Sequence, residues 1–302
     1  MRDSLSEVLN LLDMRSARCT RFEAAGRWAL RFPAKAAIKF AAVLRGSCWI
    51  VHGERAPIAL HSGDTFLLTH SPAYVLASDP DAPVEDGAEV IDWTRSDTGR
   101  YGGDDVILIA GSFRINPLHQ HLLTQALPKL MVIPRDAPSA PILSRTLQIL
   151  EIEFADAGIG AALMRHHLAD MLLVQLLRAF SKREGRCPED ERRTDWIGAL
   201  AHPRLGAALD AMHGEPARRW TVAALAGIAG MSRTAFAAAF RRAVGSTPMD
   251  YLLYWRMQVA EDLLERGHSA AQVAHALGYA SQSAFGVAFR RVKGRSPKGA
   301  IP

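Results

Sequence analysis

The chain has 302 residues and a formal net charge of +5 at pH 7, and 49% of its residues are hydrophobic against 22% charged. Such a chain folds into one or two ordinary globular domains, and no run of about eighteen apolar residues is present to span a membrane. Three cysteines in this length indicate a reducing compartment, so we expect a cytoplasmic protein with no membrane partner.

The first predicted element is a short helix at the N-terminus, in the stretch "DSLSEVLNLLD". Ser4 is a good N-cap with Glu7 three residues further on, which is the pattern of a capping box. One face of this helix collects the apolar side chains of Leu5, Val8, Leu9 and Leu12. Acidic residues interrupt any continuous apolar core, so the segment is an amphipathic helix rather than a signal peptide.

Short extended segments follow from about Arg18 to Ile133. The stretches "CWIVHG", "IALHSGDTFLLT", "AYVLAS" and "DDVILIAGSF" are rich in β-branched and aromatic residues and are bounded by Gly, Pro, Asp or Ser. Strands at this spacing are typical of a β-sandwich or a β-barrel.

The hydrophobic periodicity changes to that of a helix between Pro141 and Phe180. Six apolar residues share one stripe: Met164, Leu168, Met171, Leu172, Leu176 and Phe180. Leu173 and Leu177 widen this stripe beyond what a single core-facing side needs. A helix that is apolar over so wide an arc buries a second face, either against a dimer partner or within an intramolecular helix pair.

The charged stretch "SKREGRCPEDERRTD" precedes a basic, helical C-terminal third, and we expect a linker over residues 181–201. From His202 to the C-terminus there are 13 Lys and Arg against 6 Asp and Glu, a balance of +7. The preceding 201 residues hold 23 against 25, a balance of −2. The excess positive charge in the last third favours a polyanionic partner, although a basic solvated surface has the same composition.

The basic third contains one sequence pattern twice. "AFAAAFRRAVGSTP" begins at Ala235 and "AFGVAFRRVKGRSP" begins at Ala284, an offset of 49 residues. In each copy a glycine turn and a serine N-cap, Ser232 or Ser281, precede a helix with two phenylalanines at i and i+4 and two arginines after them. This is the pattern of a helix-turn-helix, whose second helix enters the major groove of double-stranded DNA.

Between the copies, "TPMDYLLYWRMQVAEDLLERG" predicts one long helix with Pro248 in its first turn. A helix of about twenty residues spans about 30 Å, close to the roughly 34 Å of one duplex turn. Two motifs at the ends of such a helix can therefore read successive major grooves on one face of the DNA.

From about His202 to the end, the sequence resembles the DNA-binding domain of the AraC/XylS transcription regulators. The segments "WTVAALAGIAGMSRTAFAAAFRRAVGSTPMDYLLYWRMQVAEDLL" and "VAHALGYASQSAFGVAFRRVKGRSP" match in order, spacing and residue type. Upstream, "RGSCWIVHG", "SGDTFLLT" and "QALPKLMVIP" resemble the subgroup with a cupin-like sensor. The resemblance implies a DNA-binding regulator that answers a small-molecule effector or a redox signal, with RNA polymerase as a further partner.

The resulting expectation is an α+β protein that forms a homodimer and needs no cofactor or metal. Residues 1–135 are expected to form a cupin-like β-barrel sensor, and residues 136–180 a helical dimerisation segment. After the linker, residues 202–302 are expected to form an all-α domain with two helix-turn-helix motifs joined by a long helix.

The resemblance places the DNA contacts at Ser232, Arg233, Thr234, Ala237, Ala238, Arg241, Arg242, Ser281, Gln282, Ser283, Gly286, Val287, Arg290 and Arg291. The family often has arginine or another long polar residue at the mid-helix positions, where this chain has alanine, glycine or valine. Such side chains can touch a thymine methyl group but make no bidentate contact with guanine. Base contacts are therefore expected from Arg233 and Gln282, with solvent or phosphate contact as the alternative.

The sensor segment departs from a metal-binding cupin. His52 stands where the first metal-binding histidine of a cupin is expected. The position of the next expected ligand holds Glu54, and the position of the later glutamate ligand falls on apolar residues near Ile58. We therefore expect no metal site. The candidates for a ligand pocket are Cys48, His52, His61, His70 and Tyr74, although isolated histidines are commonly structural. Cys19 and Cys48 form a redox pair if they are adjacent, and otherwise act as small buried hydrophobes.

The sequence thus predicts a one-component transcription regulator that binds DNA. The alternative is a cupin-type metal-dependent enzyme that carries a DNA-binding tail. The incomplete set of metal ligands argues against this alternative, and a metal analysis of the purified protein distinguishes the two.

Overall fold

The computed structural model describes residues 4–11, 15–33, 38–69, 73–93, 96–115, 127–156, 158–182, 184 and 196–297. The chain divides into two compact units. The barrel unit comprises Met14–Ile115 and Leu123–Arg193, and the helical unit comprises Met1–Asp13, Asn116–Leu122 and Thr194–Pro302.

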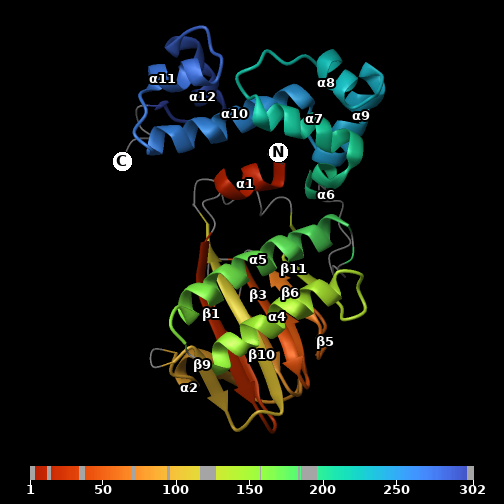
Figure 1. The fold of residues 1–302 in the computed structure, drawn as a ribbon, viewed down its shortest axis with the longest axis vertical. Coiled ribbons are helices and arrows are strands. Elements are labelled where there is room, and N and C mark those ends of the chain that lie inside the picture. The colour runs from red at the N-terminus through yellow and green to blue at the C-terminus, as the bar shows by residue number, and fades with distance from the viewer. Residues whose placement is uncertain are drawn as a thin grey trace. The chain divides into compact units, whose positions relative to one another are not determined.

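Two β-sheets build the barrel unit (Figure 1). The strands are β1 (Arg15–Ala24), β2 (Ala29–Phe32), β3 (Ile38–Arg45), β4 (Ser47–His52), β5 (Ile58–His61), β6 (Thr65–Leu68), β7 (Tyr74–Ala77), β8 (Val84–Asp86), β9 (Thr98–Tyr101), β10 (Val106–Arg114) and β11 (Leu130–Ile133). One sheet has the order β11-β6-β3-β10-β1-β9 and the other β5-β4-β7-β2-β8. Neighbouring strands are antiparallel except β9 beside β1 and β8 beside β2, which are parallel.

The two sheets enclose one hydrophobic core. Phe22 of β1 pairs with Leu108 of β10, and both side chains are buried in this core. Ile50 of β4 and Leu76 of β7 pair with each other in the second sheet and enter the same core. Alternation along each strand sends every second side chain inward, so the sheets meet as an apolar double layer. The β-rich N-terminal architecture predicted from the strand spacing is confirmed, and so is the cupin-like fold that the resemblance implied.

An antiparallel pair of helices, α4 (Ala140–Ala155) and α5 (Ala161–Ser181), covers the outer face of the six-stranded sheet (Figure 1). A further short helix, α2 (Gly87–Val90), lies beside β2 and β8. Leu168, Leu172 and Leu176 of α5 are buried within the unit, since α5 packs on β1 and on α4. Much of the apolar stripe predicted between Met164 and Phe180 is therefore buried within one chain. This agrees with the intramolecular helix pair that the sequence analysis gave as the alternative to a dimer contact.

The helical unit contains α1 (Ser4–Leu11), α6 (Trp196–Ala201), α7 (Pro203–Gly214), α8 (Val222–Ile228), α9 (Arg233–Val244), α10 (Pro248–Glu265), α11 (Ala270–Ala276) and α12 (Gln282–Lys293). Helix α6 lies in the segment predicted as a linker, but Ile197 and Ala199 are buried and α6 contacts α7 and α9. Helix α1 also contacts α6, α7 and α10, and its Val8 is buried. The helical unit therefore starts before His202 and includes the N-terminal helix.

The second helix of each motif begins at the serine cap predicted from the sequence. The Ser232 hydroxyl accepts a hydrogen bond from the Ala235 N–H at 3.2 Å, and the Ser281 hydroxyl accepts one from the Ala284 N–H at 3.1 Å. Each bond satisfies an N–H that has no partner inside the helix. Local sequence signals thus determine where both helices start.

Helices α8 and α9 meet at 86°, close to the right angle typical of a helix-turn-helix. No single helix in the described part of the chain is long and apolar enough to cross a membrane. Helices α8 and α9 reach that length and composition only when they are counted together.

Candidate DNA-binding surface and sensor cavity

Helix α9 of the first motif has one buried face and one exposed face. Phe236 and Phe240 are fully buried, with ring centroids 5.6 Å apart. On the opposite side the exposed residues are Thr234, Ala238, Arg241 and Arg242. The two phenylalanines anchor the helix on the unit, because they lie one turn apart on the same side, and the basic side is left to solvent.

Helix α12 of the second motif repeats this division. Phe285 and Phe289 are fully buried, and the exposed residues opposite them are Ser283, Val287, Arg290 and Arg291. Val287 is 70% exposed and stands where the first motif has Ala238. The two helices therefore present the same kind of surface: small or apolar side chains in the middle and two arginines at the C-terminal end.

Twelve of the fourteen predicted DNA-contact residues are exposed, and Ala237 and Gly286 are half-buried. These two follow the buried Phe236 and Phe285 by one position, about 100° around the helix, and so lie at the side of the exposed face. Ala235 and Ala284 are exposed on the outward face, although the sequence reasoning did not include them. Their position in the first turn of each helix, three residues after the serine cap, could have predicted this exposure.

Helix α10 joins the two motifs, and its Arg256 holds the loop that precedes the first of them. The guanidinium donates to the carbonyl oxygens of Pro216 at 2.6 Å and Arg218 at 2.8 Å. Gly278, in the turn of the second motif, lies against the same loop, because a Cβ atom at this position would overlap the carbonyl oxygen of Ala217. One loop therefore contacts both the connecting helix and the second motif.

A buried ionic cluster fixes the C-terminal end of α12. Glu261 of α10 accepts from Lys293 at 2.5 Å and from Arg295 at 2.6 Å, and Lys293 also donates to Gln258 at 2.9 Å. Glu261 and Gln258 are buried. Burial lowers the pKa of Lys293, and the hydrogen bond and charge of Glu261 oppose that shift. The cluster holds the turn that carries the two exposed arginines of α12.

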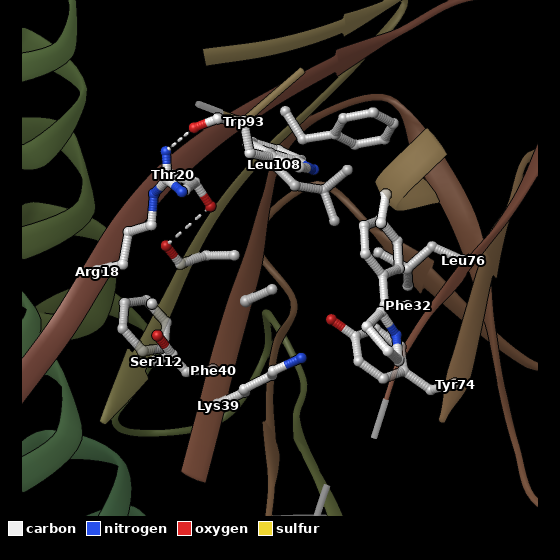
Figure 2. Close-up of a pocket in the computed structure, with 16 residues that line it drawn as sticks. Arg18, Thr20, Phe32, Lys39, Phe40, Tyr74, Leu76, Trp93, Leu108 and Ser112 are labelled. Carbon is white, nitrogen blue, oxygen red and sulfur yellow. Dashed lines mark hydrogen bonds between the residues drawn. The ribbon is translucent and has the colours of Figure 1, made fainter. Parts of the chain in front are cut away.

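The barrel unit contains a cavity of about 190 Å³ between its two sheets (Figure 2). Strands β1, β2, β3, β7 and β10 supply most of its wall. The lining residues are Arg18, Thr20, Phe22, Phe32, Pro33, Lys39, Phe40, Ala41, Tyr74, Leu76, Ala88, Trp93, Leu108, Ala110, Gly111 and Ser112.

The polar groups of the cavity lie at two places on its wall. Lys39 Nζ lies 5.0 Å from the ring centroid of Tyr74, and the ammonium and the phenol hydroxyl both point into the cavity (Figure 2). Burial raises the pKa of Tyr74, so its hydroxyl stays protonated. Arg18 donates to Asp97 at 3.1 Å and also to the carbonyl oxygen of Trp93. Asp97 thus balances the charge of Arg18, and Lys39 supplies a second positive charge to the wall.

Aromatic rings form much of the remaining wall. Phe32 and Tyr74 are stacked, with centroids 5.3 Å apart and an interplanar angle of 23°. Phe22 meets Phe32 edge to face at 6.5 Å. Trp93 lies at another part of the wall, with the Arg18 guanidinium 6.0 Å from its ring. The cavity therefore offers flat apolar surfaces together with the ammonium group.

Of the five predicted pocket residues, Tyr74 lines this cavity. Cys48 is packed in the core opposite Leu60, His52 is buried outside the lining, and His61 is exposed at the end of β5 near Asp64. His70 lies outside the described residues. The sequence reasoning missed Lys39 and the aromatic residues of β1 and β2. Alternation along "RCTRF", which places Arg18, Thr20 and Phe22 on one side of β1, was the available signal.

Neither a metal site nor a thiol switch is supported by the described residues. Among them, no group of three or more His, Cys, Asp or Glu side chains is placed to hold a metal ion. Cys19 lies on β1 and Cys48 on β4, in different sheets, and both are free and buried. Burial raises the pKa of each thiol to about 12, so little reactive thiolate forms at neutral pH.

Comparison with known proteins relates both units to regulators. A family described as Cupin matches residues 3–182, and a family described as Helix-turn-helix domain matches residues 225–300. A putative AraC-like transcription regulator of Streptomyces lividans is 39% identical over 98% of this chain and 96% of its own. The HTH-type transcriptional regulator AlkR of Acinetobacter baylyi is 28% identical over 98% of each chain.

One similar solved structure is that of a transcriptional regulator (AraC-type DNA-binding domain-containing proteins) from Chromobacterium violaceum. It is 25% identical over 34% of this chain and 92% of its own, with a TM-score of 0.32.

Proposed function

The chain belongs to the family of AraC-like transcription regulators, and we propose that the exposed faces of α9 and α12 are the surfaces through which it binds DNA. The supporting observation is the repetition, 49 residues apart, of one exposed face with two arginines at its end. Arginines in that place neutralise backbone phosphates, and the small mid-helix residues let the helix lie close to the base edges. The protein is thus a sequence-specific regulator whose two motifs read one duplex.

A binding assay with DNA from the operator region tests this role. Affinity should fall steeply with salt, by about 0.9 log units per log unit of salt for each phosphate contact. Arg291→Ala should lower the affinity for specific and nonspecific DNA alike and make the salt dependence shallower by about one contact. Arg266→Ala is the matched control, because Arg266 is exposed at the C-terminal end of α10, is not part of α9 or α12, and pairs with Asp262. An equal loss in the two variants contradicts the assignment.

We further propose that the chain acts as a homodimer through the outer surface of α4 and α5. Six large apolar side chains are exposed there: Ile142, Ile149 and Ile152 on α4, and Leu163, Met164 and Met171 on α5. Exposed apolar residues gathered on two packed helices are typical of an interaction surface, whereas scattered single residues are normal. Leu172 is not part of this surface, because it is buried against the barrel unit itself.

Sedimentation velocity at micromolar concentration tests the dimer. Ile149→Glu should shift the protein to the monomer, since it places a charge in an apolar contact. Val84→Glu, at an exposed valine on β8, is the control and should leave the sedimentation coefficient unchanged. A wild-type protein that sediments as a monomer overturns the dimer.

For the barrel unit we propose a sensing role in which a small-molecule effector occupies the cavity. The support is the position of the cavity between the two sheets and the absence of the usual metal ligands His, Cys, Asp and Glu from its described lining. This composition favours binding over metal-dependent catalysis.

We also propose that the regulator works in the cytoplasm and contacts RNA polymerase beside its DNA site. In vitro transcription with purified polymerase tests the polymerase contact.

A further inference from the structure

Val287 of α12 is the most exposed large apolar side chain described in the helical unit, with an exposed fraction of 70%. Ile228 and Met249, the next two, are 43% and 36% exposed. A single apolar residue on a protein surface is normal, so exposure alone assigns no role to Val287. Its role has to follow from its place on the helix and from its neighbours.

Val287 points directly away from the core of the helical unit. It stands two residues from each of the buried side chains of Phe285 and Phe289, so it lies about 160° around the helix from both. Ala238 of α9 occupies the corresponding place, because the two motifs repeat the same order of buried and exposed residues with an offset of 49. The centre of each outward face is therefore one aliphatic side chain, and in α12 that side chain is a valine.

The neighbours of Val287 leave it as the group that projects from the middle of the face. Ser283 and Ala284 stand one turn before it and carry short side chains, whereas Arg290 and Arg291 follow one turn after it. Arginines in that place neutralise backbone phosphates and hold the helix against the groove. Val287 is thus the apolar group that the helix brings to the base edges.

The base edges of the major groove offer one apolar partner for such a side chain. Each base pair presents hydrogen-bond donors and acceptors there, and thymine adds its C5-methyl group. Valine has no hydrogen-bonding group, so against a donor or an acceptor it displaces water without replacing the lost bond. Against a methyl group the contact removes apolar surface from water on both sides, which is favourable.

We propose that Val287 determines sequence specificity in the half of the binding site read by α12, by packing against the C5-methyl group of a thymine. This inference rests on the proposed DNA-binding function of α9 and α12, and it names the base that the second motif requires. Ala238 lacks the two γ-methyl groups of valine, so α9 reaches less far and its half of the site depends less on a thymine methyl group.

Replacement of thymine by deoxyuridine tests the contact. Binding-site selection with the full-length protein supplies a duplex, and each of its thymines in turn is replaced by deoxyuridine, which lacks only the C5-methyl group. One of these replacements should weaken binding about 3- to 5-fold, the value of burying about one methyl group. At the same position, a duplex with 5-methylcytosine should bind more tightly than one with cytosine by a similar factor, because valine makes no hydrogen bond to either base.

Substitutions of Val287 assign the methyl contact to this residue. Val287→Ala should bind the thymine and deoxyuridine duplexes about equally and keep the salt dependence of the wild type, since it removes no phosphate contact. Selection with Val287→Arg should no longer return thymine at that position, because arginine favours guanine. Met249→Ala, at an exposed apolar residue in the first turn of α10, is the matched control and should keep full sensitivity to deoxyuridine. Circular dichroism and thermal melting verify that each variant is folded.

Several results overturn the inference. It is wrong if no deoxyuridine replacement weakens binding by the wild-type protein, if folded Val287→Ala keeps the wild-type sensitivity at every thymine, or if Val287→Arg still selects thymine at the same position. It is also wrong if the cytosine and 5-methylcytosine duplexes bind alike, or if Met249→Ala loses the sensitivity as Val287→Ala does. In each case the wild-type protein still binds its selected duplex, so the proposed DNA-binding function stands. A selection that returns no specific duplex refutes that function, and the inference fails with it.

Discussion

Replacing Gly278 with alanine should destabilise the helical unit more than the same change at Gly230. Both glycines follow the first helix of their motif and have left-handed backbones, with φ of 75° and 60°. An alanine in this region costs about 1 kcal/mol at either site, because its Cβ meets the following carbonyl. The surroundings differ: the space around Gly230 is open, whereas a Cβ on Gly278 would overlap the backbone of Ala217.

The overlap adds a second cost at Gly278 alone. Forcing an extra methyl group into a packed site costs about 1–3 kcal/mol, so we expect about 2–4 kcal/mol in total at Gly278 against about 1 kcal/mol at Gly230. For a unit of this size, each kcal/mol lowers Tm by about 4 °C. Gly230→Ala should therefore lower Tm by about 4 °C, and Gly278→Ala by about 8–16 °C.

Differential scanning calorimetry of the full-length protein measures both changes. The transition of the helical unit is identified as the one that operator DNA raises, since a ligand stabilises the state that binds it. DNA affinity, measured well below both transitions, should fall more in Gly278→Ala, because the turn and α12 must move away from the loop at Ala217. Equal Tm shifts in the two variants would refute the reasoning from the close contact.

The remaining expectations concern base reading, thiol reactivity and the buried ionic cluster. Gln282→Ala should relax the base preference at one adenine in one half of the binding site, and Arg233→Ala should relax the base preference in the other half only. Binding-site selection should find a sharper sequence motif for the full-length protein than for its isolated C-terminal part. In a Cys187→Ser variant, Cys19 and Cys48 should react with a thiol reagent at pH 8 only after the protein is denatured. Burial raises the pKa of each thiol to about 12, so the folded protein forms the reactive thiolate only as the pH approaches that value. Glu261→Ala should lower the unfolding free energy of the helical unit by about 1–3 kcal/mol in denaturant titrations, since it removes the carboxylate that pairs with the partly buried ammonium group of Lys293.

The sequence by itself determined the helical unit to a large extent. The 49-residue repeat, the serine caps at 232 and 281 and the phenylalanine pairs are local signals, each read within one or two helical turns. A helix start depends on N–H groups a few residues away, and the buried face of a helix follows from spacing along the same segment. The burial of both phenylalanine pairs therefore agrees with prediction, and the residues predicted to contact DNA are exposed except Ala237 and Gly286, which are half-buried.

Only the tertiary structure decided where the sensor cavity lies. Lys39 and Tyr74 come from β3 and β7, which belong to different sheets, and neither is near the other in the sequence. The predicted histidines were selected for their chemistry, but strand pairing places His61 at an exposed edge and packs Cys48 in the core. Tertiary contacts likewise decided that Leu172 is buried within one chain. Strand order and register are set by contacts between distant segments, so residues that share a cavity carry no common local pattern.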